Sequence, residues 1–129
     1  MEAKTLAKLR KSLEDRRAEI EQDVSFMARE IKSIGEEQGD ENGGLGNHIA
    51  EDGSSMTEAE RLTIITDDMQ AMVRQINAAL ERMDEGTYGT CERCGQQIRE
   101  ERLEAFPYVM FCLDCQAMYE RELAIRGGR

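Results

Sequence analysis

The sequence is poor in the residues that usually build a compact globular core. It contains no Trp, one Pro and only 5% aromatic residues, whereas 34% of its 129 residues are charged. No stretch approaches the length of a membrane span, and residues 1–11 are too charged for a secretory signal. The length leaves little room for a second core. The composition favours a cytoplasmic chain built from long amphipathic helices that pack along narrow seams.

The net charge of −10 is concentrated in the middle of the chain. Residues 1–17 carry a net charge of +3, residues 18–60 carry −10, and residues 61–129 carry −3. Such a field repels the phosphates of nucleic acids and favours basic protein surfaces.

Apolar residues recur along the first third of the chain with the spacing of a coiled-coil helix. One row steps by seven residues through Leu6, Leu13, Ile20, Met27 and Ile34. A second, imperfect row runs through Leu9, Val24 and Ile31. Because no Gly or Pro precedes Gly35, we expect one helix of about thirty residues, about 45 Å long at 1.5 Å per residue.

Residues 35–53 differ from both flanks because they hold six of the eleven Gly residues and six carboxylates. A Gly-rich stretch does not continue a helix, so a loop is expected here. Helical signals resume at Ser55 and Thr57, each followed three residues later by Glu. A second helix that ends at Gly86 is then predicted by the apolar row Leu62, Ile65, Met69, Met72, Val73, Ile76, Leu80 and Met83.

Two helices of similar length joined by one loop bury their apolar rows most simply against each other. We therefore predict an all-α fold in which residues 1–85 form a long antiparallel helical hairpin, or coiled coil, with an acidic, Gly-rich tip at 35–55. A compact helical bundle is the alternative, but two narrow rows leave no third surface to bury. Residues 86–129 form a second domain that ends in a helix from about Leu113 to Ile125.

Four cysteines in the last third of the chain have the spacing of a metal site. Cys91, Cys94, Cys112 and Cys115 form a C-x2-C-x17-C-x2-C pattern, within the range of four-thiolate zinc sites. Two cysteines three apart in a tight turn aim both sulfurs at one centre, and two such turns complete a tetrahedron. We predict one structural Zn²⁺ ion, because four thiolates leave no open position for water.

Other chemistry has little support in the sequence. Disulfides or two redox-active pairs are the alternatives, but a cytosolic compartment opposes stable bridges and neither pair has a strand-to-helix context. His48 is the only histidine and lies in the Gly-rich stretch. No Gly-rich phosphate-binding loop followed by Lys occurs. We predict no catalytic residue and no enzyme activity.

The residues around the cysteines also follow a known pattern. The run Tyr88-Gly89-x-Cys91-x-x-Cys94-Gly95-x-x-Ile98-x-x-x-Arg102-Leu103-x-Ala105-x-Pro107, followed by Cys112-x-x-Cys115-Gln116, resembles the DksA/TraR family of C4-type zinc finger proteins. The resemblance covers about residues 86–120. The segment Asn47-His48-Ile49-Ala50-Glu51-Asp52 is similar to an N-H-x-A-D segment of the Gram-positive-type relatives.

The resemblance implies a protein partner. Members of this family bind RNA polymerase: the hairpin enters the secondary channel, the zinc end docks at the rim, and acidic tip residues approach the catalytic site. By this resemblance Glu51 and Asp52 are the nearest candidates for partner-binding tip residues, and Asp40 and Glu41 are further candidates. The D-x-x-D-x-A run of the best-known branch is absent from this chain.

These observations predict a non-enzymatic, monomeric transcription regulator that acts on RNA polymerase, without a membrane partner and without sequence-specific binding to nucleic acid. One alternative is a zinc-finger adaptor or stress protein that binds another basic partner with the same hairpin. A DNA-binding C4 finger is a second alternative, but it needs a basic face. The zinc segment offers three arginines among four glutamates: Arg93, Arg99 and Arg102 among Glu92, Glu100, Glu101 and Glu104.

Overall fold

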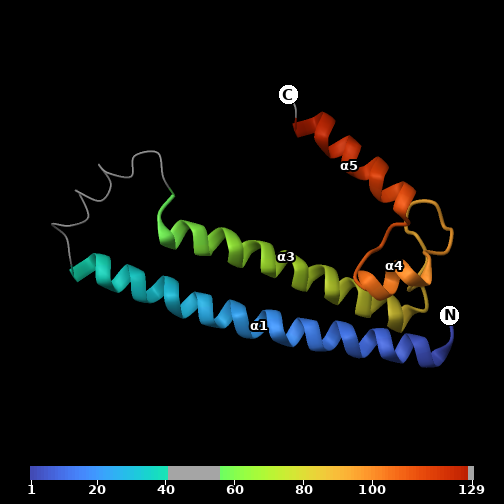
Figure 1. Cartoon of the computed structure of the whole chain (residues 1–129), viewed down its shortest axis with the longest axis horizontal. Coiled ribbons are helices and arrows are strands. Elements are labelled where there is room, and N and C mark those ends of the chain that lie inside the picture. Colours follow the sequence, from blue (N-terminus) through green and yellow to red (C-terminus); the bar gives the residue numbers. More distant parts are fainter. Residues whose placement is uncertain (41–55, 128–129) are drawn as a thin grey trace. The chain divides into compact units, whose positions relative to one another are not determined.

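The computed structural model describes residues 1–40 and 56–127. Its helices are α1 (Ala3–Asp40), α3 (Glu58–Glu85), α4 (Glu100–Ala105) and α5 (Leu113–Gly127) (Figure 1). Within these residues the only pairing of extended backbone is one isolated antiparallel bridge between Thr90 and Gln97. The all-α prediction and the C-terminal helix are confirmed. In the described part of the chain, no helix combines the length and the apolar content that crossing a bilayer requires.

Helix α1 is longer than the sequence predicted. It continues through Gly35 to Asp40, so the predicted start of the loop at residue 35 was wrong. The helix contains Gly35 and Gly39, each of which costs only about 1 kcal/mol relative to Ala, and Glu36 and Glu37 are good helix formers. The candidate tip residue Asp40 is therefore the last residue of α1.

Helix α3 begins and ends at the predicted signals. The backbone N–H of Glu60 donates to Thr57 Oγ1 at 3.1 Å, so Thr57 caps the helix. At the other end Gly86 adopts a φ of +82°, which only Gly adopts without strain. The next two backbone N–H groups then turn back to donate to the carbonyl oxygen of Arg82, at 3.0 Å and 3.2 Å. This turn directs the chain out of α3 and into the cysteine segment.

The chain divides into two compact units, Met1–Arg17 with Arg74–Arg129, and Ala18–Val73. In each unit a part of α1 lies beside a part of α3 with opposite direction (Figure 1). In the first unit Arg10 bonds to Asp84, and Arg17 bonds to Asn77, each at 2.7 Å. In the second unit the Thr66 hydroxyl lies 3.7 Å from the sulfur of Met27. Both units therefore contain the predicted antiparallel pairing.

Among the described residues, buried side chains occur only in the first unit. Its core contains Leu9, Leu13, Ile76, Ala79, Leu80, Met83, Tyr88, Ile98 and Leu103. In the second unit, the seam residues Ile20, Met27 and Met69 are only half-buried. Two helices alone cannot enclose a side chain on all sides, whereas the segment after Gly86 gives the first unit a third surface.

Candidate metal centre

The first pair of cysteines lies in a tight turn directly after α3. The bridge between Thr90 and Gln97 closes this turn. Inside it the backbone N–H of Cys91 donates to the carbonyl oxygen of Gln96 at 2.8 Å, and that of Gly95 donates to Cys91 at 2.9 Å. Gly95 has a φ of +77°, the positive value that a Gly directly after the second cysteine permits. The backbone itself thus fixes the positions of both sulfurs.

The second pair of cysteines lies where α5 begins. The backbone N–H of Gln116 donates to the carbonyl oxygen of Cys112 at 2.9 Å, so Cys115 belongs to the first turn of the helix. The backbone N–H of Glu92, in the first turn, donates to the carbonyl oxygen of Met110 at 2.9 Å. This hydrogen bond holds the two cysteine turns next to each other.

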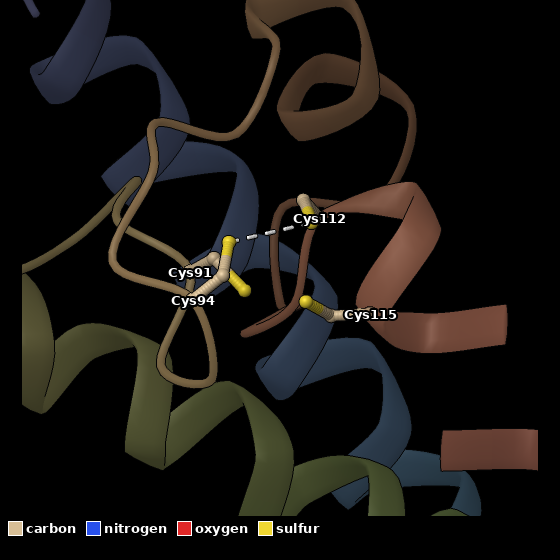
Figure 2. Close-up of side chains that lie close together, drawn as sticks. All are labelled: Cys91, Cys94, Cys112 and Cys115. Carbon is tan, nitrogen blue, oxygen red and sulfur yellow. Dashed lines mark hydrogen bonds between the residues drawn. The ribbon is translucent and has the colours of Figure 1, made fainter. Parts of the chain in front are cut away.

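Together the two turns bring four thiols to one point (Figure 2). The Sγ atoms of Cys91, Cys94, Cys112 and Cys115 all lie within 4.8 Å of one another, and those of Cys94 and Cys112 are 3.8 Å apart. A zinc–sulfur bond of about 2.3 Å in a tetrahedron requires sulfurs about 3.8 Å apart. All four cysteines are free thiols rather than disulfides. The donor set therefore fits one tetrahedral Zn²⁺ ion.

The four thiols have different surroundings. Cys91 and Cys115 are buried, whereas Cys94 is exposed. Burial raises the pKa of the Cys91 thiol, but hydrogen bonds from the backbone of Cys112, Cys94 and Arg93 outweigh it and lower that pKa to about 6. Burial, and then the neighbouring thiols, raises the pKa of Cys115 to about 12. Thiolates this close repel one another, so all four ionise together only around a cation.

An ion pair connects the first cysteine turn to α5. Both terminal nitrogens of Arg93 donate to the carboxylate of Glu122, at 2.5 Å and 3.4 Å. The two residues are 29 positions apart in the sequence. Sequence reasoning missed this contact because charge pairing over such a separation has no periodic signal.

Three side chains support the loop between α4 and the second cysteine turn. The hydroxyl of Tyr88 donates to the carbonyl oxygen of Pro107 at 2.8 Å. Arg82 donates to Val109 at 3.3 Å, and the Nε of Arg102 donates to Phe111 at 3.2 Å. Tyr88, Pro107 and Arg102 belong to the motif recognised in the sequence, although the motif gave them no role. Arg82 carried no signal, because an Arg on a charged helix is ordinary.

Among the described residues, Arg82 is the one charged residue that is buried, with 7% of its surface exposed. Its guanidinium also lies 3.7 Å from the carboxylate of Glu92 in the first cysteine turn. It therefore joins the end of α3 to both the first cysteine turn and the supporting loop.

Of the acidic candidates, one is among the described residues. Asp40 ends α1, whereas Glu41, Glu51 and Asp52 lie outside the described residues, as does His48. Of the residues singled out in the sequence, the four cysteines are those that the structure brings together.

Comparison with known proteins gives a family for the cysteine segment. Residues 86–121 match the family model of the prokaryotic dksA/traR C4-type zinc finger. The chain is 34% identical to "General stress protein 16O" of Bacillus subtilis over 105 residues, 81% of this chain and 64% of that protein. It is 36% identical to "RNA polymerase-binding transcription factor DksA" of Haemophilus influenzae over 62 residues, 47% of this chain and 43% of that protein. The chain thus covers less than two thirds of either relative.

A solved structure shows the same fold over nearly the whole chain. Transcription factor DksA2 of Pseudomonas aeruginosa superimposes with a TM-score of 0.71 at 19% identity, covering 95% of this chain and 88% of that one. The matched zinc finger is of the C4 type, and the structure supplies four thiols within reach of one ion. Family and donor set agree on one structural zinc ion.

Proposed function

We propose a function for this chain from its family, since it is a member of the DksA/TraR family of C4-type zinc finger proteins. The proposed function is that of a non-enzymatic transcription regulator that binds RNA polymerase through the secondary channel. The observation that carries this proposal is the match of residues 86–121 to the family's zinc finger. The preceding helical hairpin supports it. The Haemophilus relative is named for binding RNA polymerase, and that partner is proposed here by similarity. We also propose that the protein acts in the cytoplasm and as a monomer.

We propose Cys91, Cys94, Cys112 and Cys115 as the zinc ligands. The ion would supply a rigid connection between the two cysteine turns and no reaction chemistry, because four thiolates occupy every position of the tetrahedron. A segment with few buried apolar residues gains most of its stability from such a metal.

The charge of the second unit supports a basic partner. Its described residues carry eleven carboxylates and three basic groups. A channel that admits nucleotide phosphates presents basic groups, and complementary charge speeds docking and favours the correct partner.

The arrangement of the zinc segment argues against a DNA-binding finger. Two of its three arginines are engaged within the fold, Arg93 with Glu122 and Arg102 with the carbonyl oxygen of Phe111. DNA binding draws its affinity from Lys and Arg that reach phosphates. The segment therefore lacks the basic face that this function needs.

A stress-related adaptor is the second candidate, and the similarity to a protein named as a general stress protein favours it. Affinity capture from a cell lysate with the zinc-loaded protein separates the two candidates. Recovery of RNA polymerase subunits as the dominant partner supports the regulator. Recovery of another basic protein, without polymerase, supports the adaptor.

The tip residues Glu51 and Asp52 provide the sharper test of function. We propose that they act on the polymerase, with Asp40 and Glu41 as further candidates. Replacing both Glu51 and Asp52 by Ala should leave folding and zinc content intact and weaken polymerase binding only modestly. The effect on promoter complexes should fall much further, because the rest of the protein supplies most of the contact.

The measurement is in vitro transcription at saturating protein, beside a binding titration. A variant with Glu14→Ala and Glu81→Ala is the matched control, since it also removes two exposed carboxylates but far from the tip in sequence. Full regulatory activity of the Glu51/Asp52 variant would refute the role of the tip.

A further inference from the structure

Among the described residues of the highly charged second unit, four large apolar side chains are exposed: Phe26, Met56, Ile64 and Ile65. Two of them, Phe26 and Ile65, directly precede a position of the seam between the helices. Phe26 on α1 is 55% exposed and Ile65 on α3 is 36% exposed. Neither lies in the seam of half-buried residues between the helices, although Ile65 belongs to the apolar row from which the second helix was predicted. A Phe in water on a helix whose other outward residues are mostly charged calls for an explanation, because its burial is worth about 2 kcal/mol or more.

The positions of these side chains follow a simple rule. Phe26 directly precedes the seam residue Met27, and Ile65 directly precedes Thr66, which contacts Met27 across the seam. One residue is a rotation of about 100° in an α-helix. Because the two right-handed helices run in opposite directions, the residue before a seam position turns to the same side of the hairpin on both.

The first unit shows this geometry directly. Arg10 and Asp84 each directly follow a buried residue of the seam, Leu9 and Met83. They lie on one side and form an ion pair at 2.7 Å. Residues that follow the seam thus share one side of a hairpin, and residues that precede it share the other.

The second unit therefore has two different faces. Its preceding face consists of the residues before the seam positions: Glu19, Asp23, Phe26, Glu30 and Ser33 on α1, and Arg61, Ile65, Asp68 and Met72 on α3. Its following face consists of the residues after them: Glu21, Ser25, Ala28, Lys32 and Gly35, and Thr63, Asp67 and Gln70. The preceding face has four carboxylates, one Arg and three large apolar side chains, of which Phe26 and Ile65 are exposed and Met72 is half-buried. The following face has two carboxylates, one Lys and no apolar side chain larger than Ala.

We infer that the preceding face is the side of the hairpin that docks on its partner. The occupant is a surface on which Lys or Arg side chains flank an apolar patch, because Asp23 and Glu30 flank Phe26 and Asp68 follows Ile65 on this face, where Arg61 is the one basic residue. Apolar contact would supply affinity, and the flanking charges would fix orientation. The inference rests on the proposed function, according to which the partner's surface is a wall of the RNA polymerase channel.

The first test compares two variants that remove the same charge from opposite faces. Asp23→Asn with Glu30→Gln changes the preceding face, and Glu21→Gln with Asp67→Asn changes the following face. Their affinities for purified RNA polymerase are measured as a function of salt with full-length, zinc-loaded protein. The first pair should raise the Kd about fivefold and reduce its salt dependence, and the second should change the Kd less than about twofold.

The second test compares two exposed apolar residues. Phe26→Ala should raise the Kd about tenfold, as expected when a central aromatic contact is lost. Ile64→Ala is its control, because Ile64 is 48% exposed. In the sequence Ile64 lies midway between the seam residues Leu62 and Thr66, so its side chain points away from the seam. Neither substitution touches a buried residue, so zinc content and thermal unfolding should stay unchanged.

Each outcome decides a separate question. Equal losses for the two charge pairs, or equal affinities for Phe26→Ala and Ile64→Ala, would overturn the inference and leave the proposed function standing. A wild-type protein that does not bind polymerase would remove the proposed function and this inference together.

Discussion

Replacing Tyr88 by Phe tests how the end of α3 holds the loop before the second cysteine turn. The Tyr88 side chain is buried, and its hydroxyl donates to the carbonyl oxygen of Pro107 at 2.8 Å. The substitution removes the donor and leaves a buried carbonyl oxygen without its partner. Such a loss costs about 1–3 kcal/mol. We expect the free energy of unfolding of the zinc-loaded protein to fall by about 2 kcal/mol.

The same group predicts a pH dependence. Burial raises the pKa of Tyr88 from 10.0 to about 12, although the charge of Arg82 acts in the opposite direction. In the unfolded chain Tyr releases its proton near pH 10, while the folded protein keeps it. The stabilising contribution is therefore complete below pH 10 and is lost as the pH rises to about 12. A difference of two pKa units corresponds to roughly 2–3 kcal/mol.

The assay is urea unfolding, followed by circular dichroism, of zinc-loaded wild type and variant from pH 8 to 11. Tyr108→Phe is the matched control, because Tyr108 is half-buried and its hydroxyl makes no hydrogen bond to another described residue. Tyr88→Phe should be less stable than Tyr108→Phe at pH 8, and the difference should shrink above pH 10. Equal stability of the two variants, or a difference that is constant with pH, would refute the reasoning.

Two further predictions concern the metal and the core. Cys91→Ser or Cys112→Ser should release the zinc and unfold the segment after Gly86, because the metal supports only that segment. Helices α1 and α3 should keep much of their helicity. Retention of one equivalent of zinc by either variant, measured by elemental analysis, would contradict this prediction. Leu13→Ala should lower the free energy of unfolding by about 3 kcal/mol, because Leu13 is 0% exposed. Ile20→Ala, at a half-buried position, should lower it clearly less. Chemical unfolding of both variants checks this order.

Local patterns in the sequence determined the helices and the metal donors. The cap at Thr57 and the stop at Gly86 depend on a few neighbouring residues, so they could be identified without tertiary structure. The two C-x2-C pairs carry the same kind of information, because a tight turn aims both sulfurs of a pair at one point. The end of α1 was misjudged, since the Gly35 signal was outweighed by the helix formers around it.

Tertiary structure decided what lies between these local elements. The heptad row treated Leu13 and Met27 as equivalent, but Leu13 is fully buried while Met27 is half-buried. The difference arises because only the first unit receives a third packing surface from the folded cysteine segment. The contacts of Arg93 with Glu122 and of Arg82 with Val109 join residues 29 and 27 positions apart. No periodic pattern encodes such pairs, since they form only after the two cysteine turns have been brought together.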